Sequence, residues 1–254
     1  MAAQKNGRLV AKINEKTQQA FHAEAASAPV RKYRTTLFQV TLLLIAGSFA
    51  VLTFLVKTMT SFAIDLQITE FIQLINIPFF ALFMRLISWP GFLPQSVIIT
   101  ALIILLIYRF GLQWESLMAL FATTLSTGVN VLVKDLIQRP RPTEGMVNVI
   151  STLTSYSFPS GHVMFYLGYF GFVAFLVFSL LKPSLKRNLL LVLLCSLIIL
   201  VGPSRIFLGQ HWASDVLGAY LLGSLTLMVV IQFYRWGKTR FFIRQPVAAA
   251  TLQA

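Results

Sequence analysis

Long apolar runs dominate this chain and restrict the folds open to it. A helix that crosses a bilayer needs about 20 mainly apolar residues. The expected spans cover residues 37–56, 95–110, 114–133, 162–181, 188–208 and 213–234. Charged residues make up only 11% of the chain, against roughly 25% in a soluble domain. We therefore expect an all-α fold, a polytopic membrane bundle of six transmembrane helices.

Another apolar stretch, residues 71–87, is broken by Gln73, Asn76, Pro78 and Arg85. We expect it to form a short interfacial or re-entrant helix between the first and second spans. Trp89-Pro90-Gly91 then predicts a turn at the membrane interface. If this stretch were a seventh span, the amino terminus would change sides and much of the charge bias described next would be lost.

Lysine and arginine residues are divided unequally by the six expected spans. The side that holds both termini carries 15 of them and the other side carries 6. Because cytoplasmic loops carry an excess of these residues, we expect both termini in the cytoplasm and the protein in a cell (inner) membrane. Residues 1–36 would be a basic cytoplasmic segment, 37–236 the transmembrane domain, and 237–254 a basic and then disordered tail.

The net charge of +13 raises the question of a nucleic-acid partner. Topology accounts for most of this charge, and no stacking pattern or binding motif supports such a partner, so we expect none. Cys195 is the only cysteine, so neither an intrachain disulfide nor a cysteine metal cluster can form.

Three polar motifs lie at the ends of the apolar runs. They are Lys134-x6-Arg141-Pro142, Pro159-Ser160-Gly161-His162 and Ser204-Arg205-x5-His211-x3-Asp215. The first follows the third span, the second begins the fourth, and the last joins the fifth to the sixth. Two crossings separate the second motif from the third, so all three fall on one membrane face. The charge bias predicts that this face is extracytoplasmic.

The spacing within the motifs indicates how the side chains would act. His211 and Asp215 are four residues apart at a helix start and share one face, so the carboxylate can hold one imidazole tautomer. Asn130 has the same spacing from Lys134, and we expect it to point inward as well.

The remaining motif residues suit an anion. Ser160 and Gly161 come just before a helix, where free N–H groups favour negative charge. Arg141 and Arg205 offer planar forks that match phosphate oxygens, and Lys134 adds a point charge.

Together the motifs resemble the signature of the type 2 phosphatidic acid phosphatase superfamily. That superfamily includes membrane lipid phosphatases, glucose-6-phosphatase-like enzymes and soluble vanadium haloperoxidases. The resemblance covers roughly residues 60–235, and every motif position carries the family's residue.

The resemblance implies a metal-independent phosphatase that needs no cofactor. His211 would attack phosphorus to form a phosphohistidine, with Asp215 orienting it. His162 would protonate the leaving oxygen and then activate water. The phosphoryl oxygens would be held by Lys134, Arg141, Ser160, Gly161 and Arg205.

At headgroup level the expected substrate is an amphiphilic phosphate in the bilayer. Phosphatidic acid, phosphatidylglycerophosphate, a polyprenyl diphosphate such as undecaprenyl diphosphate, and a lipid-A-type phosphate all fit. The alternatives are phosphoryl transfer to another lipid or sugar, an anion-binding transporter, and a haloperoxidase. A transporter would leave the histidines and Asp215 unexplained, and no inverted repeat is present. The sequence does not choose among the lipids or specify an oligomeric state.

Polar and aromatic residues outside the motifs are expected to have other roles. We expect Arg139 to be a solvated or headgroup-contacting charge and Asp135 and Glu144 to be loop charges. Asp65 and Glu70 would lie on the solvated face of a surface helix. The expected interfacial anchors are Trp89, Trp212, Trp236 and Tyr234.

Overall fold

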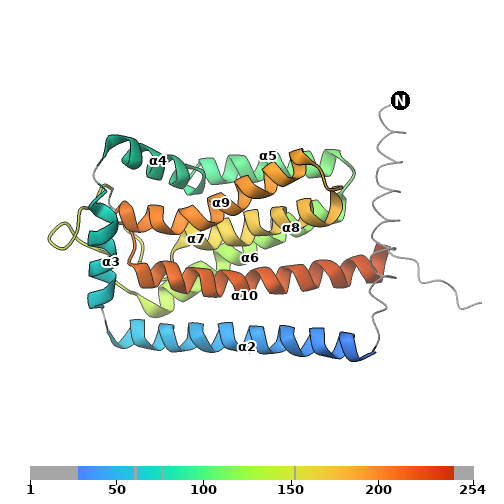
Figure 1. The fold of residues 1–254 in the computed structure, drawn as a ribbon, viewed down its shortest axis with the longest axis horizontal. Coiled ribbons are helices and arrows are strands. Elements are labelled where there is room, and N and C mark those ends of the chain that lie inside the picture. Colours follow the sequence, from blue (N-terminus) through green and yellow to red (C-terminus); the bar gives the residue numbers. More distant parts are fainter. Residues whose placement is uncertain (1–27, 60–61, 76, 152, 243–254) are drawn as a thin grey trace, which may run out of the picture.

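The computed structural model describes residues 28–59, 62–75, 77–151 and 153–242, and its regular elements are all helical. The long helices are α2 (Ala28–Thr58), α6 (Gln113–Ile137), α9 (Leu185–Phe207) and α10 (Ala213–Gly237). One further continuous run consists of α7 (Gly161–Phe165), the π-helical turn η2 (Tyr166–Phe170) and α8 (Gly171–Leu180). These helices run side by side along the long axis of the molecule (Figure 1).

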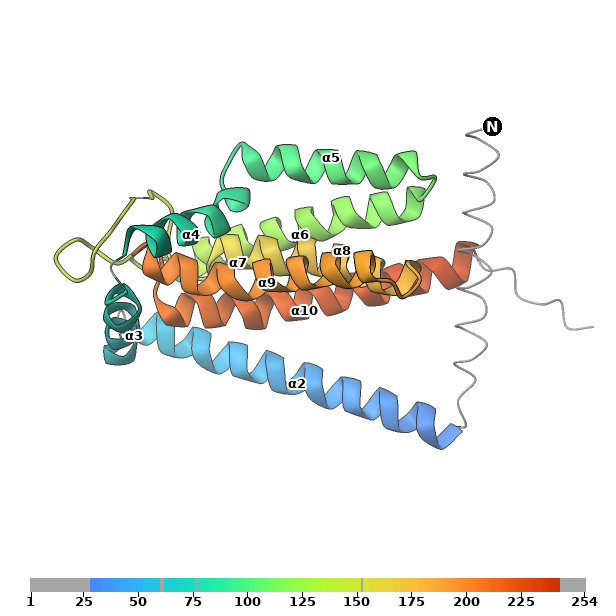
Figure 2. The same cartoon turned by 45° about the horizontal axis from the view of Figure 1, so that its top comes forward.

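Five helical segments in the described part of the chain are long and apolar enough to cross a membrane. They are Lys32–Thr58, Gln113–Ile137, Gly161–Leu180, Leu185–Phe207 and Ala213–Phe241. α5 (Gln95–Arg109) is also apolar but has only 15 residues, about 22 Å of helix. It packs against α6 (Figure 2). The expected all-α membrane bundle is confirmed, and the shorter α5 stands at the place of the second expected span.

The stretch between the first and second spans holds two helices, whereas one was expected at 71–87. α3 (Ala63–Gln73) and α4 (Pro78–Ser88) meet at a bend of 120°. Pro78 begins α4, a position where its missing N–H leaves no helical bond unmade. α3 lies across the end of the bundle (Figure 1), and α4 packs on α9. The short 3₁₀ turn η1 (Trp89–Gly91) leads on to α5.

Aromatic side chains fill the core where η2, α6, α9 and α10 meet. Tyr166, Tyr169 and Phe172 are fully buried there. α2 contrasts with this core, because only 6% of its apolar membrane-spanning stretch is buried. It lies at the edge of the bundle against α10 (Figure 2). The core therefore holds the site-bearing helices together, and α2 is an outer helix.

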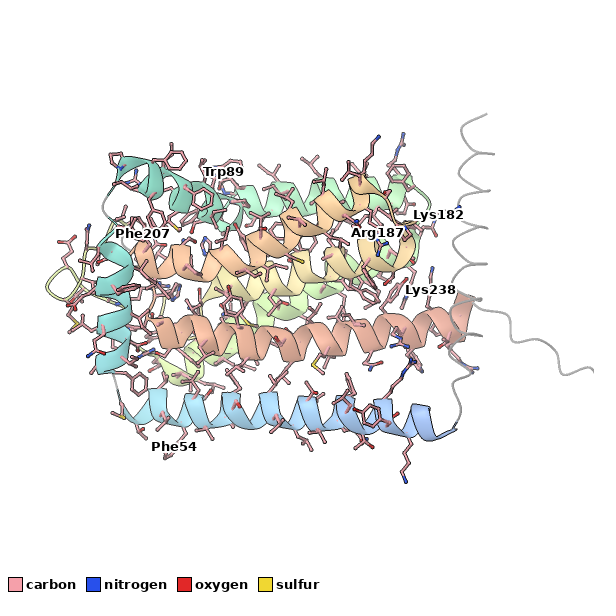
Figure 3. The ribbon with its side chains drawn as sticks, viewed as in Figure 1. Phe54, Trp89, Lys182, Arg187, Phe207 and Lys238 are labelled. Carbon is pink, nitrogen blue, oxygen red and sulfur yellow. The ribbon has the colours of Figure 1, made fainter. Side chains whose placement is uncertain are left out.

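Two of the four expected interfacial anchors are buried, so that prediction was wrong for them. Trp212 is 3% exposed and Tyr234 is 4% exposed, because both pack inside the bundle. Trp89 and Trp236 are exposed as expected, and Trp89 projects from the outer side of the bundle near α4 (Figure 3).

The expected terminal segments lie largely outside the described residues. α2 begins at Ala28, within the segment expected at 1–36. α10 ends at Gly237 and is followed by a π-helical turn, η3 (Lys238–Phe242).

Candidate active site

The carboxyl end of α6 directs the first motif across the end of the bundle. Gln138 has a left-handed backbone (φ 57°), and its N–H donates to the carbonyl of Lys134 at 2.9 Å. The Lys57 ammonium donates to the carbonyls of Leu136 and Ile137 at 3.0 and 3.3 Å. These bonds satisfy terminal carbonyls of α6 and fix the start of the loop 138–160.

Two cations of the first motif lie against one short segment of that loop. Lys134 Nζ donates to the carbonyl of Tyr156 at 2.5 Å and to that of Ser157 at 3.3 Å. Arg141 Nε donates to the carbonyl of Ser155 at 2.6 Å. The segment 155–157 therefore holds Lys134 and Arg141 beside each other.

The turn between α9 and α10 places His211 next to these cations. Gly209 has φ +67°, and a Cβ there would lie 2.3 Å from the carbonyl oxygen of Asn148, so only glycine fits this turn. His211 is 2% exposed, and its Nε2 lies 3.3 Å from Arg141 Nη1. This nitrogen faces the cations, and Nδ1 faces the other way.

Asp215 lies on the Nδ1 side of His211, within ion-pair distance of the imidazole, and it also bonds to other groups. Its Oδ2 accepts from the Trp212 N–H at 2.9 Å, which caps the start of α10. The Ser157 hydroxyl donates to the same oxygen at 2.5 Å. His211 Nδ1 is 3.4 Å from that hydroxyl and 3.5 Å from Asp215 Oδ2. Sequence reasoning missed Ser157, which lies between the expected pair.

The surroundings of His211 favour its neutral form. Burial lowers the pKa of His211 well below the ordinary value of 6.5, and the charges of Arg141, Lys134 and Arg205 lower this pKa further. A hydrogen bond with the Ser157 backbone opposes these effects in part. A neutral imidazole bonded through Nδ1 keeps the lone pair on Nε2, the nitrogen that faces the cations.

The second motif is fixed by contacts from α6 and α10. Asn130 Nδ2 donates to the carbonyl of Pro159 at 3.0 Å, and the Ser160 N–H donates to the carbonyl of Asp215 at 3.2 Å. A Cβ at Gly161 would lie 3.2 Å from Asn130 Oδ1. Asn130 points inward as expected, and it helps to place the start of α7.

The turn after α4 forms a wall against His162 and Arg205. A Cβ at Gly91 would lie 2.4 Å from His162 Cδ2, so glycine is required for this close approach. The Phe92 ring meets the His162 ring edge-on at 4.5 Å, and the Arg205 guanidinium lies 5.0 Å from the centre of the Phe92 ring. Arg205 Nη1 also donates to Ser88 Oγ at 3.1 Å.

Several buried polar atoms of the motif residues have no hydrogen-bond partner within the described residues. They are Ser160 Oγ, His162 Nε2, and Nε and Nη2 of Arg205. Leaving such atoms unpaired costs about 1–3 kcal/mol each. A phosphoryl group offers several strong acceptor oxygens to such donors. Among the described residues, no group of three or more His, Cys, Asp or Glu side chains is placed to hold a metal ion.

Two residues that sequence reasoning placed at the surface belong to this site. Arg139 is 2% exposed, with Nη1 donating to Asp215 Oδ1 at 2.6 Å and Nη2 donating to Asp65 Oδ2 at 2.8 Å. Asp65 is fully buried. The predictions of a solvated Arg139 and a solvated Asp65 were wrong, because each charge is buried against the other. Glu70 is exposed as expected, and so are Asp135 and Glu144, but Asp135 lies in the last turn of α6 and not in a loop.

Comparison with known proteins places the chain in a family. Residues 115–238 match the model of the PAP2 superfamily. Dolichyldiphosphatase 1 of Homo sapiens is 30% identical over 169 residues, which are 63% of this chain and 68% of that protein. The chain belongs to the PAP2 superfamily. This confirms the resemblance in the three motifs, which lie within the matched residues.

Other PAP2 proteins extend the comparison. Phosphatidylglycerophosphatase B of Bacillus subtilis (strain 168) is 33% identical over 142 residues, 56% of this chain and 66% of that protein. The matched part of the chain thus spans about two thirds of the length of these curated relatives. The crystal structure of a transmembrane PAP2-type phosphatidylglycerolphosphate phosphatase from Bacillus subtilis superposes with a TM-score of 0.67. It is 28% identical, and the match covers 80% of this chain and 98% of that one. Aquifex aeolicus LpxE, at 23% identity and a TM-score of 0.54, supports the fold alone.

Proposed function

We propose that the chain is an integral-membrane lipid phosphatase. It hydrolyses a phosphomonoester or diphosphate of a membrane lipid through a phosphohistidine on His211. The unpartnered donors of Ser160, His162 and Arg205 carry this proposal, because they lie in the same site as a neutral His211 whose Nε2 faces Arg141. Relatives in the same superfamily are phosphatidylglycerophosphatase and dolichyldiphosphatase by name, which supports a lipid phosphate as substrate.

In the first step the lone pair of His211 Nε2 bonds to phosphorus while the bond to the lipid oxygen breaks. His162, protonated while the negatively charged phosphate is bound beside it, gives its Nε2 proton to that oxygen, and the dephosphorylated lipid leaves. The imidazole of His211 becomes cationic as it bonds to phosphorus. Asp215 stabilises this charge through Ser157, whose hydroxyl touches both partners.

In the second step a water oxygen bonds to phosphorus and its proton passes to His162. The P–N bond breaks, phosphate leaves, and His211 returns to its neutral form. In both steps negative charge builds on the phosphoryl oxygens, and the fixed donors stabilise it. These donors are Lys134, Arg141, Arg205, the Ser160 hydroxyl and the Gly161 N–H. They supply positive charge without a metal ion.

The decisive experiment measures phosphate release by the purified protein in detergent. The substrates are phosphatidic acid, phosphatidylglycerophosphate and undecaprenyl diphosphate, each assayed with and without EDTA and ranked by kcat/KM. We expect at least one to be hydrolysed at the same rate with EDTA, and vanadate to inhibit. Hydrolysis of none would overturn the proposal. Activity lost in EDTA and restored by a divalent ion would overturn its metal-free form.

The same intermediate would also serve transfer of the phosphoryl group to an alcohol. Adding glycerol to the assay separates the two reactions, since a transferase would make a glycerol phosphate in place of inorganic phosphate. We expect inorganic phosphate to remain the main product. A dominant glycerol phosphate would replace hydrolysis by transfer.

We also propose that the site faces the extracytoplasmic side, as the Lys and Arg distribution indicates. Gly145 is a suitable reporter, because it is exposed in the loop 138–160 and a Cβ there meets nothing within 4 Å. In a Cys195→Ala background, Gly145→Cys should react with an impermeant thiol reagent on intact cells. Labelling only after lysis would reverse the orientation.

A further inference from the structure

A buried network of three charged side chains, Asp65, Arg139 and Asp215, connects α3 to the candidate active site. Arg139 donates through one guanidinium nitrogen to Asp215 and through the other to Asp65, and all three side chains are inaccessible to solvent. Asp65 also accepts from the N–H and hydroxyl of Ser214 at 2.7 and 2.6 Å. Asp65 comes from α3, Ser214 and Asp215 begin α10, and Arg139 lies in the loop between α6 and α7.

Arg139 binds the carboxylate oxygen of Asp215 that is not bonded to Ser157 or to the Trp212 N–H. It takes Oδ1 of the carboxylate, while Oδ2 receives Ser157 and the Trp212 N–H on the side of the imidazole. The guanidinium thereby fixes the rotation of the carboxyl group. A planar fork held at both ends is well suited to this, because it restrains direction as well as distance.

The summed charge of this network also acts on the protonation of His211. Two carboxylates and one guanidinium leave one net negative charge behind the imidazole. Without Asp65, the positive charge of Arg139 would act on Asp215 alone and weaken its effect on an imidazolium. The Arg139 side chain is inaccessible to solvent, and its guanidinium lies 5.3 Å from the centre of the Phe62 ring, so the missing charge would not be screened by water as at a surface.

We propose that Arg139 is a positioning residue which, held by Asp65 of α3, orients Asp215 and sets the negative charge that acts on His211. This inference rests on the proposed function, since it concerns how the nucleophile is prepared. Helix α3 lies across the end of the bundle (Figure 1). Through Asp65 it would thus act on the chemistry at His211.

Four proteins test the proposal: wild type, Asp65→Asn, Arg139→Gln and the double variant. The summed charge of residues 65, 139 and 215 becomes zero in Asp65→Asn, doubly negative in Arg139→Gln, and singly negative again in the double variant. The other groups that face His211 stay unchanged in all four: Arg141, Lys134, Arg205, His162 and Ser157. The measurement is the acid limb of log kcat/KM against pH.

We expect the acid limb to move to lower pH by roughly one unit in Asp65→Asn and to higher pH in Arg139→Gln. The double variant should return close to wild type in pH while its kcat stays low, because orientation is lost. Each single variant should lower kcat by roughly 10- to 100-fold, the range found when a partner that orients a metal ligand is removed. An acid limb at the same pH in all folded variants would overturn the proposal.

Glu70→Gln and Arg85→Gln are matched controls, because they remove the same charges at exposed positions of α3 and α4. Their kcat and acid limb should equal those of wild type. If Arg139→Gln fails to fold, Asp65→Asn decides alone, since an unmoved limb there contradicts the proposal.

NMR titration of ¹³C-labelled histidine measures the pKa of His211 without turnover, with its signal assigned through His211→Gln. The pKa of His211 should be lowest in Asp65→Asn and highest in Arg139→Gln, as for the acid limbs. A wild type that hydrolyses no lipid phosphate would therefore reject the proposed function, and the NMR ordering would still decide this inference.

Discussion

At the end of the bundle away from α3, Glu115 is buried between two partners. Lys238 Nζ lies 2.7 Å and the Tyr234 hydroxyl 3.0 Å from the same carboxylate oxygen. Lys238 and Arg187 mark this far end, and Phe207 marks the α3 end (Figure 3). Among the described residues of this cluster, one buried carboxylate contacts one ammonium and one hydroxyl.

The α3 end holds more positive charge than its own carboxylates can balance. Its buried or partly buried cations are Lys134, Arg139, Arg141 and Arg205, and its buried carboxylates are Asp65 and Asp215. Buried charge is costly unless it is paired. The difference teaches that a single buried ion pair marks structure, whereas several cations with unpartnered donors around two histidines indicate a candidate site for an anion.

The largest expected effect comes from removing the proposed nucleophile. His211→Ala should lower kcat for lipid phosphate on the order of 10⁴-fold or more, as loss of a nucleophile does in other enzymes. Tyr234→Phe at the far end should leave kcat within about twofold of wild type, because it touches none of the site. Equal losses in both variants would remove the functional contrast between the ends.

Breaking the far-end pair should affect stability and leave the chemistry intact. Glu115→Gln leaves the Lys238 ammonium buried without its carboxylate and should cost roughly 3–5 kcal/mol of unfolding free energy. The double variant Glu115→Leu with Lys238→Met should recover much of that loss. Thermal unfolding in detergent measures both, with kcat of the folded fraction as the check. A large fall in that kcat would make the far end part of the catalytic apparatus.

Replacing Arg205 tests whether unpartnered donors within the candidate site contribute to catalysis. Arg205→Lys keeps the charge but loses the unpartnered Nε and Nη2, and should lower kcat by roughly 100-fold, the cost of one transition-state donor. Arg187 is a matched control, because its Nε is also unpartnered but it lies over the Phe178 ring at the far end. Arg187→Lys should not change kcat. The idea fails if the two variants behave alike.

The smallest expected effect is a pH dependence of stability. Because the pKa of His211 is lower in the folded state, the unfolded state binds a proton first as pH falls below about 6.5. The stability that neutral His211 allows is therefore present above that pH and lost below it. The loss is at most about 1.4 kcal/mol per pH unit. Between pH 7 and pH 5 the melting temperature should fall less for His211→Asn than for wild type. An equal fall in the two proteins would contradict the burial effect.

Much of the site could be predicted because the length of apolar runs decides where motifs emerge. Lys134, His162 and Arg205 lie at the same bundle end, as the number of crossings between them requires. Pro78 is typical of a helix start, so a new helix could have been predicted there. The apolar residues on both sides of it favoured a single helix over 71–87 instead.

The pairing of Arg139 with Asp65 could not be read in the same way. The two residues are 74 positions apart, and the acidic residue at helical spacing from Arg139 is Asp135, so the sequence points to the wrong carboxylate. A charge beside a membrane span looks like a solvated headgroup contact until the fold brings its counter-charge. Ser157 was missed for a related reason, since a serine in a loop carries no signal until His211 and Asp215 lie on either side of it.

The position of α3 affects which fragment of this protein would contain the whole candidate site. The matched family segment, residues 115–238, contains every motif residue, Arg139 and Ser157. Asp65 lies 50 residues before its start. A fragment cut to the family signature would therefore keep the whole visible motif set and lack the carboxylate that accepts from Arg139 Nη2.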